Sequence, residues 1–68
     1  MTKQEAIEAM EQGKLVSHRT FGAEEYIGEF AVNYFRNEEG YIIPKKQFWK
    51  YKNHPNFNKD WKIFSNLT

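Results

Sequence analysis

A short stretch, residues 14–21, carries the side chains best suited to chemistry. It brings together a hydroxyl, an imidazole, a guanidinium and an aromatic ring, on Ser17, His18, Arg19 and Phe21. This mixture suits a flat, phosphorylated ligand, because a guanidinium forks onto phosphate oxygens and a ring stacks on a base. We therefore expect these four residues to bind a ligand.

Catalysis is not indicated by the same residues. Ser17 and His18 are neighbours on a predicted strand, so their side chains point to opposite faces and do not form a nucleophile and base pair. The chain has two histidines and no cysteine, and no spacing typical of zinc ligands occurs. We expect a protein that is not an enzyme and that needs no metal or cofactor.

Arg19 has two possible roles. It has no acidic neighbour in the strand, so its guanidinium is available to a phosphate group. The structural alternative is an exposed ion pair with Glu24 or Glu25 in the following loop, which contributes at most about 1 kcal/mol. We expect Arg19 to bind ligand.

A helix must precede this stretch. Thr2 and Glu5 have the spacing of a capping box, and Gly13 is suited to the left-handed conformation that ends a helix. The apolar stripe between them includes Met10, which we expect in the core. These signals predict a helix over residues 3–12 that packs on a sheet.

The remaining regular segments predict antiparallel strands. They are short and rich in β-branched or aromatic residues, at 15–18, 26–35, 41–43 and 60–64. The second is one strand or two, bent at Gly28 or turned near Asn33. Residues 37–40 predict a turn in which Gly40 takes a positive φ. The fold class is therefore α+β: a single domain over residues 1–68, with one N-terminal helix packed on a small antiparallel sheet of four to five strands.

Residues 44–52 leave several structures open. Pro44 lacks a backbone donor, so it lies at a sheet edge, at a strand end or in the first turn of a short helix over residues 45–48. In a strand, the rings of residues 48–51 would point to both faces, one toward the core and the other toward a ligand or a second subunit. Trp49 is a ligand residue or a core residue. Among the lysines here, Lys50 is a candidate phosphate contact.

Size and composition favour self-association. A chain of 68 residues without cysteine has a small core and no disulfide, and its six Phe, four Tyr and two Trp are enough to cover an interface as well as fill a core. No apolar run approaches the roughly 18 residues of a membrane span, and the polar N-terminus is unlike a secretory signal. We expect a cytoplasmic homo-oligomer.

Charge is distributed unevenly along the chain. Residues 1–40 hold four basic and eight acidic side chains, whereas residues 41–68 hold six lysines and one acidic residue, Asp60. Lysines alternate with rings over residues 45–52, a pattern typical of single-stranded nucleic-acid binding. The acidic N-terminal half would repel a long polyanion, so a small anionic ligand is favoured over nucleic acid.

The order of elements also carries a family resemblance. The residues that carry it are Glu5 and Ala6, residues 13–16, Arg19, Phe21, Glu39 and Gly40, Trp49, and Asp60 and Trp61. This layout resembles the small phage Thoeris anti-defence proteins, which act as sponges for cyclic nucleotide immune signals.

The resemblance implies a non-catalytic protein of the infected bacterial cytoplasm. It would assemble as a homo-oligomer, with a tetramer favoured, and enclose a nucleotide-derived molecule in pockets between subunits. Arg19 and Phe21 would line the pocket, Trp49 would flank it, and Asp60 with Trp61 would close the sheet beside it. The alternative is an inhibitor or adaptor that binds a host protein directly, such as a CRISPR effector, or single-stranded nucleic acid.

Overall fold

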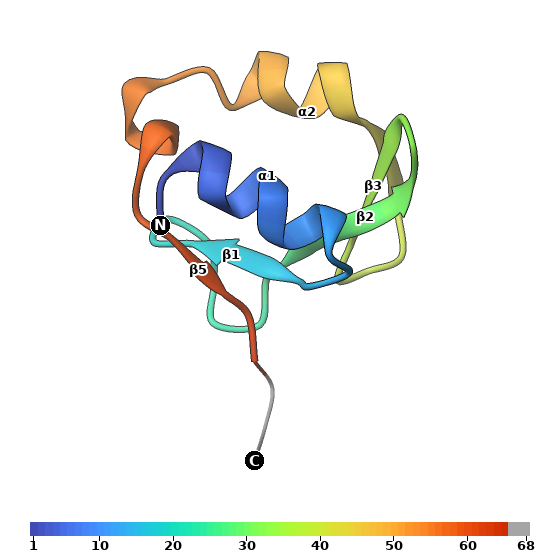
Figure 1. The fold of residues 1–68 in the computed structure, drawn as a ribbon, viewed down its shortest axis with the longest axis horizontal. Coiled ribbons are helices and arrows are strands. Elements are labelled where there is room, and N and C mark those ends of the chain that lie inside the picture. Colours follow the sequence, from blue (N-terminus) through green and yellow to red (C-terminus); the bar gives the residue numbers. More distant parts are fainter. Residues whose placement is uncertain (66–68) are drawn as a thin grey trace.

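A five-stranded antiparallel sheet carries two helices on one of its faces (Figure 1). The computed structural model describes residues 1–65, and the strand order in the sheet is β4-β3-β2-β1-β5. The elements are α1 (Lys3–Glu11), β1 (Val16–His18), β2 (Ile27–Ala31), β3 (Tyr34–Asn37), β4 (Ile42–Pro44), α2 (Lys45–Tyr51), the 3₁₀ helix η1 (Pro55–Asn58) and β5 (Trp61–Ile63). The predicted α+β class is confirmed, and α2 is an additional element.

Helix α1 forms as its local signals predict. The Thr2 hydroxyl accepts from the Glu5 backbone N–H at 3.1 Å, and the Glu5 carboxylate accepts from the Thr2 N–H at 2.8 Å. Gly13 follows the helix with a φ of 86°, a conformation that side chains with a Cβ rarely adopt. The helix buries Ala6, Ala9 and Met10 against the sheet.

The segment 26–35 forms two strands rather than one. Strands β2 and β3 are joined by a turn at residues 32–33, which confirms the alternative that placed a turn near Asn33. The next turn is held by Asn37, whose side-chain oxygen accepts from the backbone N–H groups of Glu39 and Tyr41. Gly40 has a φ of 85°, as the turn requires.

Residues 45–51 are helical, which settles the question left open by Pro44. Pro44 ends β4 and directly precedes α2, so the rings of residues 48–51 point from a helix and not from the two faces of a strand. Phe48 is buried and packs edge-on against Phe35, with ring centroids 5.3 Å apart. Tyr51, three residues later, is exposed.

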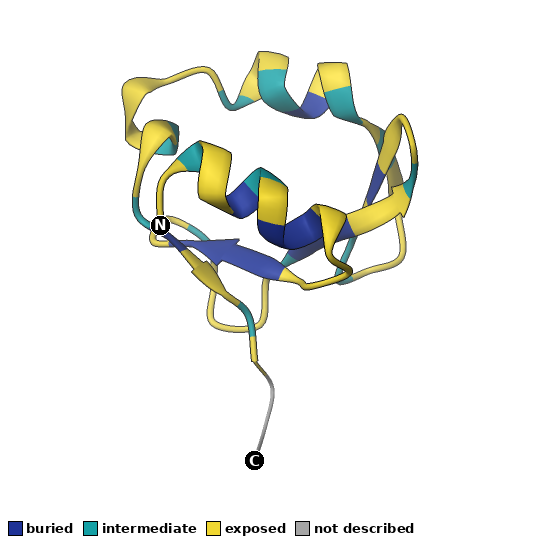
Figure 2. Ribbon diagram, in the orientation of Figure 1, coloured by how far each residue is buried: buried dark blue, intermediate teal, exposed yellow. Residues whose placement is uncertain are grey.

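Strand β5 completes the sheet beside β1. Its register pairs Val16 with Ile63 and His18 with Trp61. The buried apolar residues lie between the helices and the sheet (Figure 2), and they are Ala6, Ala9, Met10, Val16, Ile27, Phe35, Phe48 and Trp61. Trp61 is thus a core residue, while Ile63 at the end of the strand is exposed.

Candidate functional site

Ser17 and His18 lie inside the structure. Their exposed fractions are 3% and 1%. The Ser17 hydroxyl donates to the backbone carbonyl of Glu25 at 3.0 Å. Because the Thr20 backbone N–H donates to Nδ1 of His18, the ring proton is assigned to Nε2, which donates to the carbonyls of Asn56 and Lys59, each at 2.8 Å. Both side chains are fully engaged within the fold.

His18 also belongs to an aromatic cluster. Its ring centroid lies 4.6 Å from that of Phe57, 4.9 Å from Trp61 and 6.0 Å from Phe21. The cluster fixes the conformation of the segment after β1. Phe21, the outermost member, is half-buried and keeps part of its ring accessible.

Arg19 forms an ion pair with Asp60 and not with Glu24 or Glu25. Its Nε lies 3.3 Å from Oδ2 of Asp60, with 67% and 34% of the two side chains exposed. The backbone N–H of Arg19 also donates to the Asp60 carbonyl at 3.1 Å. The expectation of a free guanidinium is therefore wrong, because β5 brings a carboxylate that is distant in sequence beside the end of β1.

Trp49 and Lys50 lie on α2, away from this pair. The Trp49 ring packs edge-on against Phe48 and Trp61, and the Lys3 ammonium lies 4.4 Å from its centroid. Lys50 is exposed. Among the seven predicted ligand residues, the structure brings His18, Phe21 and Trp49 together around the Trp61 ring and pairs Arg19 with Asp60, but it does not gather all seven in one site.

A cleft opens between the loop after β1, the adjoining ends of β2 and β3, and the second half of α2. It has a volume of about 350 Å³. Among the predicted residues, Phe21 lines it. The other rings around it come from Tyr26, Phe48 and Tyr51, and the strand residue Ile27 forms its apolar floor.

Two amides and two carboxylates also face the cleft. The amides belong to Asn37 and Gln47, and the carboxylates to Glu25 and Glu38. The carboxylates are held by the backbone: Glu38 accepts from the Tyr26 N–H at 3.2 Å, and Glu25 accepts from the Gly22 N–H at 2.9 Å. Each bond occupies one carboxylate oxygen and leaves the other as an acceptor.

The cation of the cleft is Lys52, at the end of α2. Its ammonium lies 5.5 Å from the ring centroid of Phe21 and 5.3 Å from that of Phe57. A cation over ring faces is attracted electrostatically and stays available to an anion. Acceptors and a cation thus share one aromatic cleft.

Most of this cleft is not predicted from the sequence, because the pattern of residues 44–52 fits a strand as well as a helix. In a helix, Gln47, Phe48 and Tyr51 recur at i, i+1 and i+4 and so share one face. That spacing is the signal that would have placed them together. In a strand the same residues divide between two faces.

The cleft is equipped for recognition. Rings can stack on a planar group, amides and carboxylates can bind its polar edge, and Lys52 can pair with an anion. In residues 1–65, no three His, Asp or Glu side chains are grouped as metal ligands, and no helix is long and apolar enough to cross a membrane. No family model, curated protein or solved structure matches this chain.

Proposed function

We propose that this protein is a non-catalytic binding protein that holds a small nucleotide-derived molecule in the cleft beside α2. The observation that carries the proposal is the composition of that cleft, in which four aromatic side chains, two amides, two carboxylates and one lysine surround about 350 Å³. This volume falls within the range of ordinary small-molecule sites. The family resemblance supports a biological role: sequestration of a cyclic nucleotide immune signal in phage-infected bacteria.

The arrangement suggests how a nucleotide would lie. Tyr51 is 72% exposed and Phe21 is half-buried, so both offer ring surface to a base. Stacking contributes about 1–3 kcal/mol per base. The carboxylates of Glu25 and Glu38 would accept from base N–H groups or ribose hydroxyls, since an ionised carboxylate is only an acceptor. Phosphate would then lie toward Lys52.

Arg19, which pairs with Asp60 and does not line the cleft, remains a proposed phosphate ligand. Its side chain is two-thirds exposed, and an exposed ion pair with Asp60 is weak enough to exchange for a phosphate. We also propose that the protein acts as a homo-oligomer, with a tetramer favoured, in the cytoplasm of the infected cell. Ligand binding requires no chemistry in this scheme.

A second candidate function rests on the outer surface of α2. Lys46 and Lys50 lie one turn apart and exposed, and Lys3 lies over Trp49 nearby. This basic and aromatic surface would suit single-stranded nucleic acid. Lys45 is not part of it, because its ammonium is paired with Glu29 at 2.7 Å.

Calorimetric titration with guanine and adenine mononucleotides and cyclic dinucleotides tests the principal proposal. Tyr51→Ala should weaken binding at least about tenfold, the equivalent of one lost stacking contact, and leave the melting temperature unchanged. Tyr41→Ala is the matched control, because Tyr41 is 65% exposed and does not line the cleft. Lys52→Ala tests the charge in the same way and should weaken binding. Lys50→Ala is its control, because Lys50 does not line the cleft.

Three outcomes would count against the proposal. Undiminished affinity in Tyr51→Ala would move the ligand away from this cleft, and loss of binding in Arg19→Ala alone would move it to the Arg19 surface. Failure to bind any nucleotide, together with binding of a single-stranded oligonucleotide that Lys50→Ala weakens, would favour the second candidate. Mass spectrometry of small molecules released from the purified protein provides an independent check.

A further inference from the structure

The part of the sheet face opposite the helices that β2, β3 and β4 form carries exposed apolar side chains, whereas Ser17 on β1 is buried beneath the loop that contains Glu25. Both helices pack on the face that carries Val16, Phe35 and Trp61, so the alternate residues of the strands point outward. Large apolar side chains on this outer face keep much of their surface exposed: Leu15 37%, Phe30 54%, Tyr34 43% and Ile42 43%. Exposed apolar side chains that gather on one face are typical of an interaction surface.

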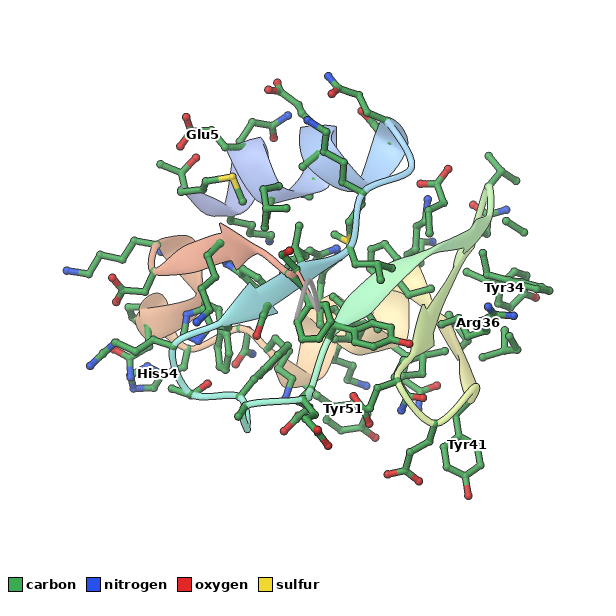
Figure 3. The ribbon with its side chains drawn as sticks, turned by 90° about the horizontal axis from the view of Figure 1, so that it is seen from below. Glu5, Tyr34, Arg36, Tyr41, Tyr51 and His54 are labelled. Carbon is green, nitrogen blue, oxygen red and sulfur yellow. The ribbon has the colours of Figure 1, made fainter. Side chains whose placement is uncertain are left out.

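Strand register joins these residues into one strip. Gly28 pairs with Arg36, and Arg36 pairs with Ile42, so the three lie in one row across β2, β3 and β4. The Leu15 side chain packs directly against Gly28. A Cβ added at position 28 would lie only 2.5 Å from Cδ2 of Leu15. Figure 3 shows Tyr34 and Arg36 projecting side by side from this part of the sheet.

Arg36 is the cation of the strip. Its guanidinium lies 5.9 Å from the ring centroid of Phe30, and within residues 1–65 it forms no ion pair. An arginine stacked on a ring amid apolar neighbours is the residue type most often found at the energetic centre of an interface.

An acidic hollow lies at the start of β2 and the end of β3, where Tyr26 and Glu38 alternate with the inward-facing pair of Ile27 and Asn37 and so lie on the outer face. Its volume is about 270 Å³, and Glu24, Tyr26, Glu38 and Phe64 line it. The rings of Tyr26 and Phe64 pack together with centroids 4.7 Å apart. The hollow therefore offers what a guanidinium binds best, carboxylates beside aromatic rings.

We propose that two copies of this chain associate through their outer sheet faces, with Arg36 of each copy inserted into the acidic hollow of the other. A two-fold interface brings one patch against itself, so a patch that carries both the cation and its acceptor makes two identical ion pairs. The apolar strip would be buried between them. This inference names the surface for the self-association proposed above, and the hollow shares Tyr26 and Glu38 with the ligand cleft.

Sedimentation of the full chain over a micromolar concentration range tests the interface. The unaltered protein should form a dimer or a larger assembly, and Arg36→Glu should raise its dissociation constant at least about tenfold. Lys50→Glu is the matched control, since it reverses an exposed charge on α2, away from the outer face. Circular dichroism should show that both variants keep the fold.

A mixing experiment tests the two-fold pairing itself. Arg36→Glu alone places carboxylate against carboxylate, and Glu24→Lys alone places cation against cation, so each should be monomeric. Mixed together, each hybrid dimer regains two opposite-charge pairs and should associate. Glu24 is substituted instead of Glu38, because the Glu38 carboxylate also accepts a hydrogen bond from the backbone N–H of Tyr26.

Two results would overturn the inference. A wild-type chain that stays monomeric would exclude self-association through any face. An assembly that Arg36→Glu and Phe30→Ser leave intact would place the interface elsewhere. Neither result bears on nucleotide binding, which calorimetry measures separately.

Discussion

The Nε2 of His18 and the backbone carbonyl of Asn56 are joined by a 2.8 Å hydrogen bond across 38 residues of chain. The same nitrogen reaches the carbonyl of Lys59, so one buried side chain anchors the whole segment that leads into β5. An aromatic residue of similar size preserves the ring contacts and loses these bonds.

His18→Phe should therefore lower the free energy of unfolding by about 2 kcal/mol, because it removes the donor of two part-buried hydrogen bonds. Ser17→Ala is the comparison, since it removes a single bond to Glu25 and should cost about 1 kcal/mol. Denaturant unfolding measures both. Equal stabilities of His18→Phe and the unaltered protein would show that the anchored segment finds other partners.

Asp60 combines a strained backbone with an exposed ion pair. Its φ is 70°, a region that Asn and Asp tolerate better than Ala does. Asp60→Asn should cost no more than Arg19→Ala, at most about 1 kcal/mol, since both remove only the ion pair. Asp60→Ala should cost about 1 kcal/mol more, through strain. Chemical denaturation of the three variants would contradict this if the Ala and Asn variants were equally stable.

Gly28 is required by its neighbour on the outer face. Gly28→Ala brings a Cβ into Leu15 and should cost about 1 kcal/mol, because Leu15 can partly rotate away. Combining it with Leu15→Ala removes the clash, so the two changes should be non-additive by at least about 0.5 kcal/mol. Thermal or denaturant unfolding of the double-mutant cycle decides the point, and strict additivity would argue against the contact.

The cap of α1 gives the protein a pH dependence. The hydrogen bond from the Thr2 backbone N–H lowers the pKa of Glu5 below its ordinary value of 4.5, and the Thr2 hydroxyl bond acts in the same direction. The Glu5 carboxylate thus binds a proton less readily in the folded state than in the unfolded chain. The stabilisation that the ionised Glu5 carboxylate gives the folded state is fully present above pH 4.5. It is lost as the pH falls through the lower pKa of the folded state.

Glu5→Gln isolates this contribution. The variant should melt below the unaltered protein at about pH 7, and the gap should be smaller at about pH 3, because protonation of the native carboxyl increases as the pH falls. Melting curves at the two pH values measure it. A gap of constant size would mean that the charge of Glu5 has no part in the cap.

Local signals account for the parts of the fold that the sequence predicts. The capping box of Thr2 and Glu5 and the positive φ of Gly13 and Gly40 depend only on nearby residues. The helix α2 has no comparable signal, because no side chain caps it and its rings suit a strand as well. Its identity is decided by packing of Phe48 on Phe35.

The candidate site was harder to predict for the same reason. Phe21 belongs to it and was identified from its type, whereas Tyr51 and Lys52 became neighbours of Phe21 only through the position of α2. The pairing of Arg19 with Asp60 likewise depends on β5 lying beside β1. Neither relationship is encoded in local spacing.

The position of Trp61 in β5 also bears on how the protein opens. Its ring is 2% exposed and meets those of His18, Phe21, Trp49 and Phe57, and its backbone N–H donates to the carbonyl of Met1. Strand β5 cannot detach without withdrawing this ring from the core, so fraying from this side is coupled to global unfolding. The amide hydrogen of Trp61, which is bonded to Met1, should therefore exchange with solvent deuterium as slowly as those of the central strands.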